Sequence, residues 1–316
     1  MYDGFMMECR DKKTIEERIK GALLGEVYVT PKPGLVDLHD CGAHSDMDVS
    51  TFQRSADAIT PYLLKMYHAG ISFAEKAERD FFPELFSHVR EIGKDAEKAM
   101  FHATNNVNTH KGIIFSMGLL LTAMGVDAAE KQRESKGERA WDIATLPYEE
   151  RICFLAGRIP GSVLKQELNA MSATDRPSAD GSTNAPTHGE QVFAAYGAEG
   201  VRGEAIASFP CLREIALPRY RSMSDAGLSE NDRALDTLLA IMSKLTDTNI
   251  LSRGGSDALN FVQSRAARIL SSLTPGSTSW RQEIEAFNQE CIKKNVSPGG
   301  AADILALTLL LTQPLT

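Results

Sequence analysis

Apolar residues recur at helical spacing along most of the chain, and this periodicity constrains the fold more than any other feature. Between residues 14 and 29 the spacing places Ile15, Ile19, Leu23 and Val27 on one face of a helix. The segment begins with a Thr-x-x-Glu capping box and is followed by "TPKPG", whose two prolines and glycine cannot continue a helix. Runs of β-branched residues with a period of two are few. The pattern therefore predicts an all-α fold.

Further helices are expected wherever this spacing returns. A second capping pattern, "STFQ", opens one near Ser50, and Pro61 is a candidate kink in it. The expected helices span residues 14–29, 50–68, 83–104, 109–124, 148–157, 188–196, 228–244, 257–272, 279–294 and 298–312. Because no internal repeat or domain boundary is evident, the whole chain, 1–316, is predicted to form one compact multi-helix domain. The segment 172–187 is poor in apolar residues and is predicted to be a mobile loop, a candidate lid.

Charge and cysteine usage exclude several classes of protein. The formal net charge is −8, whereas a nucleic-acid-binding protein usually carries a basic face. The five cysteines are scattered, odd in number and without a CxxC pair, which is typical of reduced thiols in the cytoplasm. No apolar signal core is visible near residue 1, and the longest apolar runs are too short and interrupted to cross a membrane. We therefore expect a cytoplasmic protein without nucleic-acid or membrane partners.

Polar, glycine-rich clusters interrupt the helical pattern where helices begin or end. They read "TPKPGLVDLHDCGAHSDMD" (30–48), "NTHKG" (108–112), "GVRGEA" (200–205), "LTDTNILSRGG" (245–255) and "SPGGAAD" (297–303). Helix N-termini offer free N–H groups to phosphate, and glycine allows close approach of the backbone to a ligand. Carboxylates cannot bind phosphate directly, but they can hold Mg²⁺. Each cluster alone is consistent with an ordinary cap or turn, whereas the five together indicate a site for a metal and a polyphosphate.

The clusters resemble those of the triphosphoribosyl-dephospho-CoA synthase family, the CitG type. The resemblance rests on "TPKPGLVD", "GAHSDMD" with "TFQRSA", "NTHKGIIFSMGLL", "YGAEGVRGEA" followed by "FP", "DTNILSRGG" and "GGAADILALT", in this order over roughly residues 14–311. It implies an all-α enzyme that transfers the 5-triphosphoribosyl group of ATP to the 2′-hydroxyl of 3′-dephospho-CoA and releases adenine. The product would be the prosthetic-group precursor for the acyl carrier protein of citrate lyase or malonate decarboxylase, passed on to a transferase that loads that protein. The oligomeric state, a homodimer included, stays open.

Two features depart from the family pattern. The glycine that the family usually has before "FP" is Ser208 in this chain, and the stretch 130–187 aligns with nothing in the pattern. Both departures concern local substrate contacts more than the reaction itself.

The residues of the clusters supply the groups that this reaction needs. An oxocarbenium-like transition state at the ribose C1′ calls for a nearby anion, a base for the attacking hydroxyl, a proton donor for adenine and cations for the triphosphate. The catalytic candidates are Asp37, His44, Asp46, His110 and Glu204. The substrate-binding candidates are Lys32, Asn108, Thr109, Lys111, Gly112, Arg202, Asn249, Arg253, Gly254, Gly255, Gly299 and Gly300. Asp46, Asp48, Asp247 and Asp303 are expected to hold Mg²⁺.

Four aspartates exceed what one Mg²⁺ usually takes from a protein. Either two ions bind, or some of the aspartates steady the charge at C1′ or take the hydroxyl proton. A simpler alternative is that Asp46 and Asp48 only cap the helix that begins near Ser50.

Two other functions stay open at this point. The start "RIKGALLGE" and the paired aspartates of "HSDMD" resemble Mg²⁺-dependent ADP-ribosyl hydrolases, although the consecutive "DD" of that family is missing and "NTHKG" has no place in it. A non-catalytic nucleotide or CoA sensor would bind both substrates without turnover, and it would need no carboxylates at the ribose.

Overall fold

The computed structural model describes residues 3–76, 81–137, 143–173 and 188–313, and every regular element within these ranges is a helix. The prediction of an all-α fold is confirmed. The elements are α1 (Asp3–Tyr28), α2 (Val49–Lys76), α3 (Phe82–Ala103), α4 (Lys111–Ser135), α5 (Tyr148–Arg158), α6 (Gly161–Ala173), α7 (His188–Tyr196), α8 (Gly200–Ile206), the π-helix η1 (Cys211–Ala216), α9 (Leu217–Asp225), α10 (Glu230–Met242), α11 (Thr248–Ser272), α12 (Thr278–Lys294) and α13 (Gly299–Thr312). Of the predicted mobile loop, all but its first two residues lie outside the described residues.

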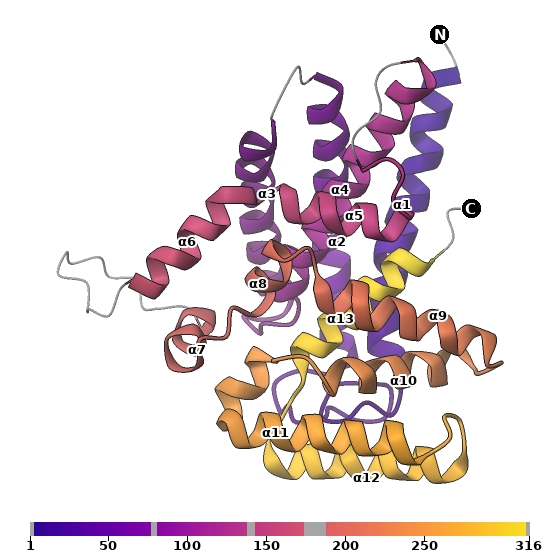
Figure 1. Ribbon diagram of the computed structural model, residues 1–316, viewed down its shortest axis with the longest axis vertical. Helices are drawn as coiled ribbons and strands as arrows, with labels where there is room; N and C mark the ends of the chain where they lie inside the picture. Colours follow the sequence, from indigo (N-terminus) through magenta and orange to yellow (C-terminus); the bar gives the residue numbers. More distant parts are fainter. Residues whose placement is uncertain (1–2, 77–80, 138–142, 174–187, 314–316) are drawn as a thin grey trace.

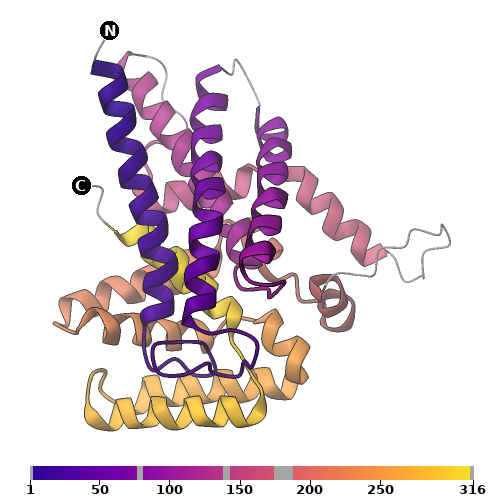
Figure 2. The same cartoon turned by 180° about the vertical axis from the view of Figure 1, so that it is seen from behind.

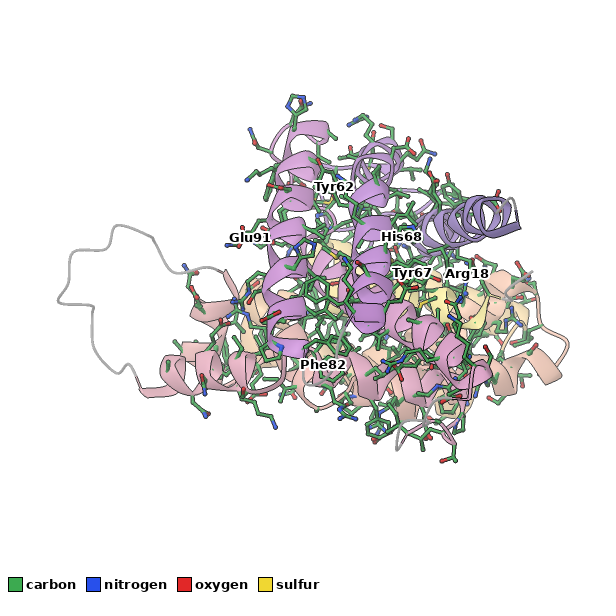
Figure 3. The ribbon with its side chains drawn as sticks, turned by 90° about the horizontal axis from the view of Figure 1, so that it is seen from above. Arg18, Tyr62, Tyr67, His68, Phe82 and Glu91 are labelled. Atoms are coloured by element: carbon green, nitrogen blue, oxygen red, sulfur yellow. The ribbon has the colours of Figure 1, made fainter. Side chains whose placement is uncertain are left out.

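The helices form an upright bundle that stands on a set of crossing helices. In Figure 1, α1, α2, α3 and α4 run side by side, α10, α11 and α12 cross below them, and α13 runs obliquely between the two groups. Viewed from above, α2 and α3 lie next to each other, with the labelled Tyr62 on α2 and Glu91 on α3 (Figure 3). This arrangement brings the start of α4 against the start of α13.

Helix α4 is the centre of the hydrophobic core. Its run from Ile113 to Val126 is almost wholly buried, which explains why it is apolar on all sides instead of on one stripe. By length and composition it is the one helix among the described residues that could cross a membrane, but 83% of its most apolar window is buried inside the protein. The structure therefore accounts for its composition as that of a core helix.

Two glycines let α2 and α4 pack with their backbones in contact. A Cβ atom at Gly70 would lie 2.1 Å from the Thr122 carbonyl oxygen, and one at Gly125 would lie 2.0 Å from the Tyr67 carbonyl oxygen. Side chains at these positions would force the helices apart, so the close crossing depends on both glycines.

The helix boundaries follow local signals at most positions. Ser229, Asp247 and Ser277 accept backbone N–H groups as N-caps of α10, α11 and α12, and Asn295 ends α12 in the left-handed conformation. The sequence did not predict α6, α8, α9 or the π-helix. It also placed the start of α11 too late, since α11 begins at Thr248 and is broken at Gly255, where φ is 66°. Helix α2 runs on through Pro61 to Lys76.

The loop 29–48 connects α1 to α2 beneath the upright bundle, above α12 (Figure 2). Two asparagines fasten it to the crossing helices. Asn231 of α10 accepts the N–H of Thr30 and donates to its carbonyl, and Asn288 of α12 accepts the N–H of Gly34 and donates to Asp40. The first of the five polar clusters is thereby held in one place.

Candidate functional site

Asp37 shapes the loop that carries the first cluster. Its carboxylate is buried and accepts the N–H groups of Lys32 at 2.7 Å, His39 at 2.7 Å and Asp40 at 3.1 Å. Backbone amides occupy both oxygens of Asp37. The geometry therefore indicates that this catalytic candidate stabilises the fold of the loop.

Lys32 forms a buried ion pair with Glu26, a residue that the sequence analysis did not single out. Its ammonium group lies 2.5 Å from Glu26 Oε1 and 2.9 Å from the Glu26 carbonyl oxygen, and both side chains are buried. Burial raises the pKa of Glu26, and the Lys32 charge opposes that shift. Glu26 follows Ala22 and Leu23 on the apolar face of α1, and an acid on such a face was the signal that could have revealed it.

His110 is a buried neutral imidazole at the start of α4. Its Nδ1 lies 2.6 Å from Ser55 Oγ, which also accepts the Thr109 hydroxyl at 2.7 Å, and its ring packs edge-on against Phe52. Burial, aided by the charge of Lys32, lowers the pKa of His110 to about 3. Its Nε2 has no hydrogen-bond partner within the described ranges. Ser55, on the buried face of α2, is a second residue that the sequence analysis missed.

Asp303 lies against the start of α4 although it belongs to α13, just beyond the first turn of that helix. A Cβ atom at Gly112 would lie 2.1 Å from Asp303 Oδ2, so the backbone of α4 touches the carboxylate. Burial, together with the charges of Asp247 and Glu26, raises the pKa of Asp303 well above its usual range. In the part of the chain that the structure describes, its carboxylate has no hydrogen-bond partner. It is therefore the one member of this group of three acids with both oxygens free for a ligand.

Asp247 joins the starts of α11 and α13. One oxygen caps α11 by accepting the N–H of Asn249 at 2.8 Å, and the other accepts the N–H of Ala301 at 3.0 Å. Gly300 lies against the same carboxylate, since a Cβ atom there would be 3.0 Å from Oδ2. Burial raises the pKa of Asp247, although the amide hydrogen bonds oppose the shift. The positive ends of two helix dipoles thus meet at one buried acid.

Two more polar clusters contact the start of α11. A Cβ atom at Gly299 would come within 2.9 Å of the Asn249 side-chain nitrogen, and one at Gly200, which opens α8, within 3.0 Å of Thr248. Further along α8, Glu204 accepts the N–H of Cys211 at 3.1 Å, and burial raises its pKa. Arg202 is half-buried on the same helix. The structure therefore brings "GVRGEA", "DTN" and "SPGG" together.

His44 belongs to a second polar group at the edge of the loop. Its Nδ1 lies 3.2 Å from the guanidinium of Arg253, and its Nε2 lies 2.8 Å from Ser297 Oγ. Since a guanidinium can only donate, Nδ1 accepts and Nε2 carries the proton toward Ser297. Burial, with the Arg253 charge second, lowers the pKa of His44, and Asp46 lies 3.7 Å from Nδ1. The imidazole is held as a neutral donor.

Arg253 also donates to the carbonyl oxygen of Ala43. In the sequence it directly precedes Gly254 and Gly255, where α11 is broken.

Three of the predicted site residues have capping or surface contacts. Asp48 accepts the N–H and the hydroxyl of Thr51 at the start of α2, and these bonds with one from Ser50 lower its pKa to about 2. Asn108 accepts the N–H of Lys111, whose exposed ammonium group pairs with Glu97 at 3.0 Å. Within the described residues no group of three or more His, Cys, Asp or Glu side chains could hold a metal ion by itself. The four predicted metal ligands do not form a ready-made cage.

The model of the ATP:dephospho-CoA triphosphoribosyl transferase family matches residues 12–314.

The chain belongs to this family.

Two relatives are each 38% identical to this chain. One is the 2-(5''-triphosphoribosyl)-3'-dephosphocoenzyme-A synthase of Pectobacterium atrosepticum, aligned over 94% of this chain and 88% of the relative. The other is the probable synthase of the same name in Pectobacterium carotovorum subsp. carotovorum, aligned over 96% of this chain and 90% of the relative. No solved structure matches the chain. The family resemblance inferred from the five clusters is confirmed.

The fold also gives a reason for one departure from the family pattern. Ser208, at the place where the triphosphoribosyl transferase family usually has glycine, has φ 60°, a left-handed conformation that glycine adopts without strain. A Cβ atom at Gly157 of α5 would lie 2.4 Å from Ser208 Oγ, so serine fits there because position 157 carries no side chain.

Proposed function

We propose that this chain transfers the 5-triphosphoribosyl group of ATP to the 2′-hydroxyl of 3′-dephospho-CoA and releases adenine. The family match over residues 12–314 carries the proposal. The convergence of "NTHKG", "DTN" and "SPGGAAD" on Asp303 supports it, because it gathers helix N-termini, glycines and an unpaired acid at one place. The named relatives are synthases of this product.

The reaction breaks the bond between ATP C1′ and the adenine nitrogen, and it forms a bond from C1′ to the 2′-oxygen of 3′-dephospho-CoA. The hydroxyl proton must leave, and adenine must gain one. Positive charge develops at C1′ in the transition state, as in other glycosyl transfers. In our proposal the acids Asp303, Asp247 and Glu26 provide the negative potential that stabilises this charge, because a nearby cation favours the ionised form of a carboxyl and opposes the effect of burial. The neutral His110 offers Nε2 as a hydrogen-bonding group beside them.

Lys32 has a different role in this proposal from the one that the sequence predicts. Because its ammonium group lies on Glu26, it is a counter-ion that keeps the buried acids from repelling the triphosphate. In this proposal phosphate is contacted by N–H groups at the start of α4 and by the cations Arg202, Arg253 and Lys111.

Mg²⁺ is the cofactor that we propose. The donor set fits it, because Asp303 is an unpaired carboxylate beside two other acids and Mg²⁺ is commonly held by one or two carboxylates with phosphates and water. Asp303 would hold the ion, which would neutralise charge on the ATP triphosphate.

We also propose the wider context that the family resemblance implies. The product would be the precursor of the prosthetic group of citrate lyase or malonate decarboxylase, made in the cytoplasm and passed to a transferase that loads the acyl carrier protein. A protein of net charge −8 suits a small anionic substrate bound by local cations and does not suit nucleic acid.

One assay tests the function directly. Purified protein is incubated with ATP, 3′-dephospho-CoA and Mg²⁺, and adenine is measured by chromatography. Adenine release that requires both substrates is expected. Release of ADP-ribose from a modified protein would instead favour the hydrolase alternative, and binding of both substrates without turnover would favour a sensor.

A further inference from the structure

A cavity of about 530 Å³ lies where α1, α9, α10 and α13 meet, and we call it the α1–α9 cavity. The residues of its lining that matter here are Gly25, Tyr220, Arg221, Asn231, Arg233 and Leu309. None of the lining residues comes from the five polar clusters, so the reaction site described above does not account for it. Its volume is in the range of small-molecule sites.

Arg233 is a lining cation without a carboxylate partner among the described residues, although Glu149 and Glu230 also belong to the lining. Its guanidinium donates to Ser224 Oγ at 2.9 Å and to the Tyr220 hydroxyl at 2.8 Å, and it lies over the Tyr220 ring. Its Nε is buried and has no partner, and no carboxylate pairs with it among the described residues. The neighbouring Arg221, in contrast, pairs with Glu149. A half-buried arginine held only by hydroxyl groups can still donate to an anion.

Arg18 is a buried cation near the α13 end of the cavity, outside its lining. It precedes the lining residue Gly21 by one turn of α1, is only 4% exposed, and donates to the carbonyl of Leu310 at 2.8 Å. Its Nε and Nη1 have no partner among the described residues. In Figure 3 its side chain lies over the end of α13. The positive potential there favours an anionic ligand.

The wall of the cavity is partly bare backbone. Gly25 would place a Cβ atom 3.4 Å from Leu309 Cδ1 and near nothing else, so a larger side chain there would have to extend into the open space. The bare wall leaves room for a ligand along α1.

The cavity lies close to the reaction site along two shared elements. On α1, Gly25 lines the cavity and Glu26 faces Lys32 in the reaction site. On α13, Asp303 and Leu309 are six residues apart, about 9 Å along a helix. Asn231, another lining residue, also holds the loop at Thr30.

We propose that the α1–α9 cavity binds the diphosphate and pantetheine arm of 3′-dephospho-CoA, with Arg233 against the diphosphate. This inference rests on the proposed function, in which the ribose of the same substrate is attacked at the α4–α13 site. The arm carries two phosphate charges and an extended chain of amides and methylenes, which matches a cavity with arginines at its wall and a mixed polar and apolar lining. ATP, in contrast, lacks such an arm.

The test uses the full chain and compares wild type with Arg233→Met and Gly25→Met. Arg233→Met keeps a long side chain over the Tyr220 ring but removes the positive charge. Gly25→Met places a side chain in the open space of the cavity. In each variant we expect KM and Kd for 3′-dephospho-CoA to rise at least about tenfold, with KM for ATP unchanged. Arg268→Met, which removes an exposed cation on α11, is the matched control and should change neither constant.

The outcomes separate the two proposals. If both variants fold, by thermal unfolding, and keep wild-type constants for 3′-dephospho-CoA, or if KM for ATP rises instead, the cavity assignment is overturned. If wild type binds 3′-dephospho-CoA by calorimetry, the variants bind it weakly and no adenine is released, the cavity assignment stands and the proposed transfer fails. If wild type neither binds it nor releases adenine, both fail. Should one variant not fold, the other decides.

Discussion

Gly112 at the start of α4 lies directly against the carboxylate of Asp303 at the start of α13. A methyl group at position 112 would come within 2.1 Å of Asp303 Oδ2, closer than any real Cβ contact. The carboxylate can therefore keep its place only if residue 112 is glycine. A motif that reads as a helix start in the sequence thus positions an acid that lies far along the chain.

We predict that Gly112→Ala folds normally but loses activity. Alanine is a better helix former than glycine by about 1 kcal/mol, so the substitution stabilises α4 itself. The new methyl group must push the Asp303 carboxylate aside, and a displacement of about 1 Å can cost about a hundredfold in rate. The measurement is kcat for adenine release together with the melting temperature.

The matched control is Gly93→Ala on α3. Its Cβ atom would meet the Met66 side chain at 3.5 Å and the Ile114 side chain at 3.9 Å, both ordinary contacts, so rate and stability should stay close to wild type. Unchanged turnover in Gly112→Ala would show that the position of Asp303 does not matter for the reaction.

The residues in the site also divide into those that a sequence can reveal and those that it cannot. "NTHKG" and "SPGGAAD" were recognisable because helix starts have a local signature of polar caps and glycines. The contact between Gly112 and Asp303 depends on how α4 and α13 pack, and no local pattern encodes that packing. The same holds for Lys32, whose ammonium group looks like a phosphate ligand until the fold places Glu26 beside it.

Two of the missed helices, α8 and α9, share a physical reason. The helices α8 and α9 are short and α9 is polar, so their apolar spacing covers too few turns to be recognised. The break in α11 at Gly255 could be guessed from "GG", but the preceding turn is helical because Asp247 caps it, a bond that only the structure shows.

We predict that His110 stays neutral from pH 5 to pH 8 and carries its proton on Nε2. The pKa of about 3 in the folded protein lies below the value of about 6.5 in an unfolded chain. The contribution of the neutral His110 imidazole to the free energy of unfolding is therefore present above pH 6.5. It is lost as the pH falls toward 3, because the unfolded state takes up the proton first. Nitrogen NMR of the imidazole in this range should show no titration and a protonated Nε2, and a shift of the His110 signals near pH 6.5 would contradict the assignment.

Ser55→Ala tests what holds that imidazole. Removing the hydroxyl leaves Nδ1 without its partner and frees the ring to change tautomer, so kcat should fall by up to about tenfold with a smaller effect on KM. Thr60→Val removes another buried hydroxyl of α2, one that bonds only to the Ala56 carbonyl of its own helix, and should leave kcat unchanged. Equal effects of the two substitutions would reduce Ser55 to a packing residue.

We predict that Gly125→Ala destabilises the protein through the crossing of α2 and α4. The added methyl group would lie 2.0 Å from the Tyr67 carbonyl oxygen, and backbone cannot move aside as a side chain can. Overpacking of this kind costs about 3 kcal/mol of unfolding free energy. Chemical denaturation measures the loss, and Gly189→Ala on α7, where a Cβ atom meets nothing within 4 Å, provides the control. A stability equal to that of the control would mean that the two helices separate at little cost.

Asp48 and Asp303 are both predicted magnesium ligands, and the structure gives them different surroundings. Asp48 is saturated by Ser50 and Thr51 in the first turn of α2, whereas Asp303 has no hydrogen-bond partner among the described residues. We therefore expect Asp303→Asn to raise the Mg²⁺ concentration for half-maximal turnover at least about tenfold, as loss of a carboxylate near the ion requires. Asp48→Asn keeps the capping shape and should leave that concentration unchanged, while Asp48→Ala should lower the melting temperature because the cap is gone. Magnesium titrations of adenine release decide the matter. A raised requirement in Asp48→Asn would place the ion at the loop 29–48 and not at α13, and an unchanged one in Asp303→Asn would remove the reason for placing it beside Gly112.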